Sequence, residues 1–305
     1  MTGLTAICII ILMPDNLSYL SSKVNKFIDY LEFEKKYSPL TIRNYSHYLK
    51  RFLDFLIKGK INKLSDLNVC QMHNYQDELS RLNLSKKTIG FHLISVRSFL
   101  KYLTKTGENV ISIDKIDIPK SESTKLIFLN GPDVERLLNT PDTSSLQGKR
   151  DRAILELFYA TGLRISELTA LDRDSFDLIK KEIKSKKKIV FLSSRALKWL
   201  TEYIERREDK HKALFTSAKG IVTRLSPRSV ERMLKKYTKI ANLPSNITPK
   251  ALRHSFATDL LLAGAELGSV QKMLGHKNIS TTQIYTHVTN KQLHEIHEQF
   301  HGRGK

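Results

Sequence analysis

Apolar side chains recur at helical spacing through the first hundred residues. Residues 18–104 carry them three and four positions apart, as amphipathic helices do. Ser38 before Pro39 is a typical helix start, and Ser85 is a second N-cap. Short connections between the helices predict a small four-helix bundle. The predicted helices cover residues 18–36, 38–57, 63–82 and 84–107.

The rest of the chain is also mainly helical, with one break. Residues 177–194 shift to β-type residues and predict a short hairpin. Residues 105–127 show no sustained period and contain Pro119, which is typical of a linker. We therefore expect an N-terminal extension, a helical domain, a linker and a second domain, at residues 1–17, 18–108, 109–127 and 128–305.

One long apolar run precedes the first helix. It spans Leu4 to Met13, about half the length that crosses a bilayer. No Lys or Arg precedes it, so it lacks the basic start of a secretory signal. We interpret it as an extension rather than a membrane anchor. Met13 leads straight into the first helix and offers an alternative translation start.

The charge of the chain indicates its partner. Lys and Arg number 51 against 31 Asp and Glu, a formal net charge of +20. These positive charges repel one another in the folded state, so we expect the partner to be a polyanion. Nucleic acid is the first candidate and an anionic membrane surface the second. Two cysteines, Cys8 and Cys70, provide no disulfide framework and fit a reducing compartment.

The stretch TPKALRHSFATDLL, residues 248–261, carries basic groups at a helix start. Thr248 and Pro249 suit the cap and first helical positions, and Lys250 and Arg253 lie one turn apart. Helix N-termini bind anions through free N–H groups and the dipole. Taken alone, however, the stretch favours a solvated basic helix end, because the helix dipole favours acids rather than bases there.

Two other stretches carry possible phosphoryl chemistry. In ATGLRISEL, Arg164 follows the break at Gly162, and arginine grips phosphodiesters through its planar fork of donors. In LGHKNISTTQIYTHV, Tyr285 follows His276, and a tyrosine can attack phosphorus if a neighbour assists its deprotonation. A surface arginine and a packed tyrosine are the plain alternatives.

Together, the stretches LFYATGLRISEL, LRHSFATDLL and LGHKNISTTQIYTHV resemble the motif set of the tyrosine site-specific recombinases, or phage integrase family, and most closely its Xer branch. The resemblance covers about residues 18–301. It implies a mainly α protein of two domains, an N-terminal SAM-like core-binding domain and a C-terminal α+β catalytic domain with a small sheet. It also implies an enzyme that cleaves and rejoins DNA through a 3′-phosphotyrosyl intermediate.

The resemblance assigns roles to individual residues. Arg164 and Arg253 match the two arginines that clamp the scissile phosphate, and Tyr285 matches the nucleophile. His276 matches the histidine that assists the tyrosine, and Glu167 lies one turn from Arg164 and can orient it. This is phosphoryl transfer by positioning and charge stabilisation.

The sequence departs from the family pattern at two places. Lys250 stands where the Xer branch usually has histidine, so an electrostatic role replaces proton acceptance. The hairpin EIKSKKKIVFL is shorter than the family's and lacks both glycines. A hairpin lysine protonates the leaving oxygen in the family. Alignment on IVFL makes Lys184 the first candidate and Lys186 the second.

The resemblance also implies partners. We expect double-stranded DNA with paired inverted sites and a homo-tetramer, or a hetero-tetramer with a paralogue, in the cytoplasm on the nucleoid. No cofactor and no metal is expected, since no paired carboxylates suggest a two-metal nuclease and the histidine row His294, His297 and His301 lacks completing ligands. The expected DNA contacts are Arg43, Lys86, Lys87, Arg97, Arg228 and Arg232.

Several functions remain open at this level. Within the recombinases, chromosome or plasmid dimer resolution competes with integration of a phage or mobile element. The compact length, without an extra arm-binding domain, favours the Xer-like role. A non-catalytic DNA-binding protein on the same fold is the second hypothesis, supported by the altered hairpin and Lys250. A nicking-rejoining topoisomerase is the third.

Overall fold

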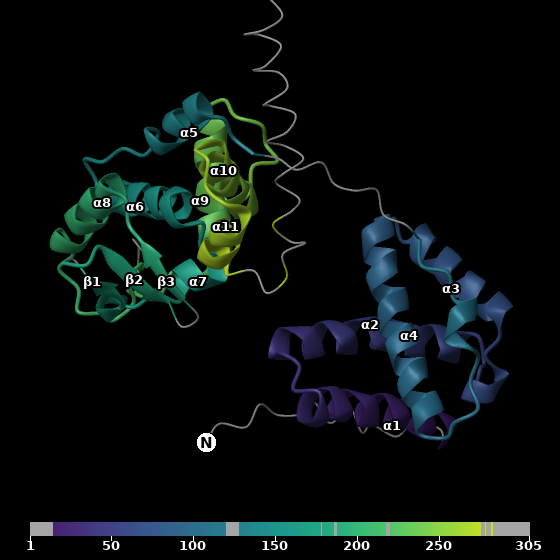
Figure 1. Cartoon of the computed structure of the whole chain (residues 1–305). Coiled ribbons are helices and arrows are strands. Elements are labelled where there is room, and N and C mark those ends of the chain that lie inside the picture. The colour runs from purple at the N-terminus through teal and green to yellow at the C-terminus, as the bar shows by residue number, and fades with distance from the viewer. Residues whose placement is uncertain are drawn as a thin grey trace, which may run out of the picture. The chain divides into compact units, whose positions relative to one another are not determined.

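The structure is a computed structural model that divides into two compact units, Met1–Thr124 and Lys125–Lys305. It describes residues 15–119, 128–177, 179–185, 188–217 and 220–275, together with residues 278 and 282. Side chains are described from Tyr19 onward. The apolar run at residues 4–13 lies outside this part of the chain. Each unit is taken by itself (Figure 1).

The described residues of unit 1 form four α-helices, α1 (Asp15–Asp29), α2 (Pro39–Lys58), α3 (Val69–Arg81) and α4 (Lys86–Lys105). A five-residue π-helix, η1 (Tyr30–Glu34), continues α1. Ser38 and Ser85 cap α2 and α4 as predicted. Two 3₁₀ turns complete the unit, η2 (Leu64–Asp66) and η3 (Ile113–Lys115).

The third helix starts later than its sequence pattern predicts. The Asn68 side chain accepts from Gln71 N at 3.1 Å, and the Gln71 side chain accepts from Asn68 N at 2.7 Å. This reciprocal capping box fixes the helix start at residue 69. The preceding apolar residues form the 3₁₀ turn η2 instead, with Leu64 buried.

Part of the expected linker packs on unit 1. Ile116 is buried in the same core as Phe27, Phe52 and Phe99. The Gln76 side chain donates to Asp117 O at 2.7 Å, which ties this segment to α3. The burial of Ile116 and the hydrogen bond from the Gln76 side chain together stabilise the packing of this segment on unit 1. Residues 120–127 of the linker lie outside the described residues.

Unit 2 is mainly helical with a small sheet, so the predicted fold class is confirmed. The antiparallel sheet has the order β1 (Phe176–Asp177), β2 (Glu182–Ser185), β3 (Lys188–Phe191), and β2 and β3 form the predicted hairpin. A 3₁₀ turn, η4 (Arg173–Ser175), precedes it. The helices are α5 (Gly131–Leu138), α6 (Leu146–Thr161), α7 (Ile165–Thr169), α8 (Ser194–Glu205), α9 (Pro227–Ile240), α10 (Pro249–Leu262) and α11 (Leu267–Leu274).

Helix α6 is the centre of unit 2 and is buried on all sides, against α8 and α10. Its charged residues are therefore paired, because an unpaired buried charge is costly. Glu156 accepts from Arg152 Nε and from Arg195 Nε, both at 2.9 Å. Asp151 accepts from the Tyr237 hydroxyl at 2.9 Å. These bonds hold α6 in place within unit 2, and the site is built at its C-terminus.

Among the described helices, none combines the length and apolarity that a membrane crossing needs.

A buried histidine makes unit 1 sensitive to acid. His92 is 1% exposed, and its Nδ1 lies 3.2 Å from the Tyr75 hydroxyl. Burial, with the positive Arg51 and with His47 nearby, lowers the pKa of His92 to about 4. The imidazole is therefore neutral at pH 7, and the two side chains share one hydrogen bond. Burial raises the pKa of Tyr75, so the phenol stays protonated.

We predict that unit 1 loses stability as the pH falls from 6.5 to 4. The unfolded chain binds a proton at His92 over that range and the folded chain does not, so the loss is about 2 kcal/mol. Urea denaturation followed by circular dichroism at pH 7 and 4.5 measures it. His92→Gln should lose less stability on acidification than wild type. The matched variant of exposed His73, His73→Gln, should behave as wild type, and equal losses in all three would contradict the prediction.

Candidate active site

The site forms where α6 ends against α10 and α11. Gly162 closes α6 with a positive φ of 56°. A Cβ at this position would lie 2.5 Å from Phe256 Cδ1 and 3.0 Å from Leu274 Cδ2, so only glycine permits the close approach. Figure 1 shows β3 and α7 beside the lower ends of α10 and α11. Helix ends and the hairpin thus meet at one place in unit 2.

Arg253 connects two of these helix ends. It lies on α10 and is 6% exposed. Its Nη1 donates to Gly162 O at the end of α6, and its Nη2 donates to Leu274 O at the end of α11, at 2.6 Å. Carbonyls at helix C-termini lack intrahelical partners and carry the negative end of the dipole, so they suit a buried guanidinium. Arg253 is therefore held in one orientation by the backbone.

Arg164 lies at the start of α7, two residues after Gly162. The Glu167 carboxylate accepts hydrogen bonds from Arg164 N at 2.9 Å and from Arg164 Nη1 at 3.0 Å. The Arg164 side chain is 43% exposed, whereas that of Glu167 is 10% exposed. Hydrogen bonds to Arg164 hold the pKa of Glu167 below its usual value, against the effect of burial. An ionised carboxylate therefore orients an arginine that still reaches solvent.

Lys188, the first residue of β3, is a functional candidate that the sequence analysis did not select. Its Nζ donates to Met273 O at 2.6 Å, one residue before the carbonyl that Arg253 binds. Its alkyl chain passes Gly275, since a Cβ there would lie 3.5 Å from Lys188 Cδ. The hairpin is thereby joined to the C-terminus of α11.

The surroundings of Lys188 change its acidity. Burial, the positive charge of Arg253 and then that of Arg164 lower the pKa of Lys188 to about 8, while the nearby Glu167 opposes the change. These four charged groups are thus close enough to act on one another. An ammonium with a pKa near neutrality can hold a proton at pH 7 and release it readily.

Lys184, the first candidate for the proton donor, does not join this cluster. Its partner across the sheet is Ile189, whereas Lys188 pairs with Ser185. Successive side chains on a strand point to opposite faces, so Lys184 and Lys188 lie on opposite faces of the hairpin. Lys184 is exposed and Lys188 is half-buried. Strand alternation thus separates Lys184 from the cluster, and its role as proton donor stays a prediction. Lys186, the second candidate, lies outside the described residues.

The other predicted catalytic residues are placed only in part. Lys250 lies in the first turn of α10 and is exposed. Thr248 caps this helix as predicted, with its hydroxyl accepting from Ala251 N at 3.3 Å. His276 follows Gly275, the left-handed cap of α11. His276 and Tyr285, like the row of His294, His297 and His301, lie outside the described residues.

The predicted DNA contacts lie on both units. In unit 1, Arg43 is exposed on α2, Lys86 and Lys87 are exposed at the start of α4, and Arg97 is half-buried on α4. In unit 2, Arg228 and Arg232 are exposed on α9. Arg232 also lines an open cavity of about 390 Å³.

Two family models match the chain. The model of the phage integrase family matches residues 128–292, and that of the phage integrase N-terminal SAM-like domain matches residues 24–107. The second match falls on the helices of unit 1. The first covers the described site and the stretch that contains His276 and Tyr285.

Known proteins resemble the chain over most of its length. Tyrosine recombinase XerD of Staphylococcus epidermidis is 34% identical, over 93% of this chain and 100% of XerD. Tyrosine recombinase XerC of Pelotomaculum thermopropionicum is 35% identical, over 92% of this chain and 98% of XerC. The crystal structure of XerH site-specific recombinase bound to difH substrate, a pre-cleavage complex, is 25% identical, with a TM-score of 0.67 over 90% of this chain and 83% of XerH. The chain belongs to the phage integrase family and is a site-specific tyrosine recombinase of the Xer type.

Proposed function

We propose that this recombinase cleaves and rejoins double-stranded DNA at paired inverted sites, with Tyr285 as the nucleophile. The observation that supports this most directly is the cluster of Arg253, Arg164 and Lys188 around the C-terminus of α11. Three cations held this close repel one another in the free protein. A bound phosphodiester, which is an anion, relieves that repulsion.

The arginines stabilise the pentavalent phosphorus. Arg253 is fixed by two carbonyls, and Arg164 is oriented by Glu167. Charge that develops on the non-bridging oxygens then meets donors that need little reorganisation. Lys250 adds positive charge at the start of α10, where the helix dipole has the same sign. It serves electrostatically and not as a base.

The reaction is a transesterification. The Tyr285 oxygen forms a bond to phosphorus, the bond from phosphorus to O5′ breaks, and the 3′ end remains attached to the tyrosine. The Tyr285 proton leaves with the assistance of His276, and O5′ takes a proton from the Lys188 ammonium. Rejoining runs the same steps in reverse, with a 5′-hydroxyl as the attacking group and neutral Lys188 accepting its proton.

We further propose a cellular role in resolving chromosome or plasmid dimers. Its support is the similarity to XerD and XerC along nearly the full length of those proteins. XerH is described as bound to its difH substrate, which supports DNA as the partner of this chain. Action as a tetramer, of one chain or with a paralogue, and a place on the nucleoid belong to the same proposal.

We predict that Tyr285→Phe abolishes a covalent adduct with DNA. Suicide duplexes carry a nick near the cleavage position, so that cleavage releases a short fragment and traps the enzyme. The site is first selected by binding from randomised duplexes. With EDTA present, wild type should give a protein–DNA band that survives denaturation.

The exposed tyrosine of α1 provides the control for this experiment. Tyr19→Phe should form the adduct as wild type does, because Tyr19 lies in unit 1 and bonds only to Glu108 among the residues described. Absence of the adduct in wild type on a bound site would exclude the enzyme. An adduct that persists in Tyr285→Phe would exclude this nucleophile.

We predict that Lys188→Ala slows single-turnover cleavage by about 100-fold or more, the usual contribution of a general acid. A substrate with sulfur in place of O5′ needs no proton on leaving, and should restore the rate to within about tenfold of wild type. The cleavage rate of the oxygen substrate should fall as the pH rises past about 8, because the ammonium form is then lost. The sulfur substrate should show no such fall.

Lys184→Ala is the matched control, since it removes a lysine from the exposed face of the same hairpin. It should cleave both substrates at rates close to wild type. If sulfur rescues Lys184→Ala or Lys186→Ala and not Lys188→Ala, the proton donor is that other lysine and Lys188 has a different role.

A further inference from the structure

Unit 1 carries an exposed aromatic side chain between two acids. Phe33 lies on the π-helix η1 and is 71% exposed. Glu32 and Glu34 on either side are exposed as well. Neither makes an ion pair with any residue in the described part of the chain. We call Glu32, Phe33 and Glu34 the acidic knob. The Phe33 ring adds nothing to the core of unit 1, and aromatic rings are enriched where proteins contact one another.

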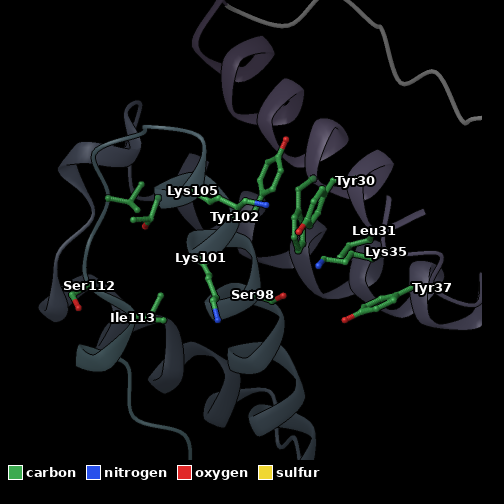
Figure 2. A pocket seen from close by; sticks show the side chains of 13 residues that line it. Tyr30, Leu31, Lys35, Tyr37, Ser98, Lys101, Tyr102, Lys105, Ser112 and Ile113 are labelled. Carbon is green, nitrogen blue, oxygen red and sulfur yellow. The ribbon is translucent and has the colours of Figure 1, made fainter. Parts of the chain in front are cut away.

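A pocket of opposite character lies beside this knob. It has a volume of about 740 Å³ and lies between the end of α1, η1, α4 and the segment before η3. Figure 2 shows Tyr30 and Lys35 on one side, Ser112 and Ile113 on the other, and the α4 residues Lys101 and Tyr102 between them. The floor is aromatic, with the Tyr30 and Tyr102 ring centroids 4.8 Å apart. We call this the basic pocket.

Three lysines surround the basic pocket. Lys35, Lys101 and Lys105 line it and are exposed, and no carboxylate is found among its described lining residues. Lys35 Nζ lies 5.6 Å from the Tyr30 ring centroid and Lys105 Nζ lies 5.8 Å from it. Cation–π contacts with Tyr30 thus hold the ammonium groups of Lys35 and Lys105 at the rim.

The knob does not fill its own pocket. Tyr30, Leu31 and Lys35 of this segment line the pocket, but Phe33 between them does not. The two surfaces are complementary in chemistry. The knob has one aromatic ring and two carboxylates, and the pocket has an aromatic floor and three ammonium groups. We propose that the acidic knob of one copy of this chain docks into the basic pocket of a second copy. Phe33 enters the aromatic floor, and Glu32 and Glu34 pair with the lysines.

The contact is small and polar at its rim, so it is transient in free solution. Because knob and pocket are adjacent, a two-fold arrangement can satisfy both at once, and a head-to-tail arrangement can extend to further copies. The knob and the pocket lining include none of the four predicted DNA contacts of unit 1, Arg43, Lys86, Lys87 and Arg97. The inference does not rest on the proposed catalytic function, and it can be tested without DNA.

Sedimentation velocity of the full chain tests the contact. At low salt, about 50 mM, where ion pairs are weakly screened, wild type should self-associate with a dissociation constant at or below about 100 µM. Phe33→Ala should weaken association about tenfold or more, as loss of a buried aromatic anchor does. Leu82→Ser, at a leucine that is 51% exposed at the end of α3, should associate as wild type does.

Charge reversal separates this contact from any other. One variant carries Glu32→Lys and Glu34→Lys, and a second carries Lys101→Glu and Lys105→Glu. Each alone presents like charges at both surfaces and should remain monomeric. Mixed together, the two variants present opposite charges at both surfaces, and association should return.

Each outcome decides the matter, provided that circular dichroism shows the variants folded. Wild type that stays monomeric at about 100 µM overturns the proposal. So does Phe33→Ala that associates as wild type does, or a mixture of the reversed variants that stays monomeric. Loss of association in Leu82→Ser as well would show a contact elsewhere and would equally overturn it. Tyr285 and Lys188 are unchanged in every variant, so a failure of catalysis does not bear on this result.

Discussion

The site depends on one buried guanidinium. Arg253 joins the carbonyl of Gly162, the cap of α6, to the last carbonyl of α11, so it connects two helix ends that are distant in sequence. Those carbonyls would otherwise lack partners in the protein interior, which costs free energy. The same bonds hold the end of α6, two residues before Arg164, against the end of α11. The hydrogen bonds that stabilise the fold here therefore also position Arg253 in the site.

The hairpin joins this arrangement through the next carbonyl along α11. Lys188 binds Met273 O while Arg253 binds Leu274 O, so two cations share one helix C-terminus. The negative end of a helix dipole is the right place for them. Burial of the ammonium, and then its repulsion by Arg253, nevertheless lowers the pKa of Lys188. The positive charges of Arg253 and Lys188 therefore favour the binding of an anion at the proposed phosphodiester site.

The sequence predicted the two-domain organisation, the fold class and the caps at Ser38, Ser85 and Thr248, because these follow from local spacing and short polar side chains. It also placed Glu167 within reach of Arg164. It selected Lys184 because motif alignment ignores strand parity. Lys184 directly follows the buried Ile183, so alternation alone could have excluded it from the inner face. The bonds of Arg253 to two distant carbonyls, and the close contact that requires Gly162, depend on tertiary packing, and no local pattern encodes them.

Proton donation by Lys188 requires a desolvated ammonium beside Arg253. An NMR titration of lysine side chains labelled at the ε-carbon measures its pKa, with the resonance assigned by Lys188→Arg. A desolvated Lys188 predicts an inflection at about pH 8 in the free protein. It also predicts a rise of that value in Arg253→Gln, because a neighbouring positive charge is removed. An inflection at the ordinary lysine value of 10.5, unchanged by Arg253→Gln, would contradict it.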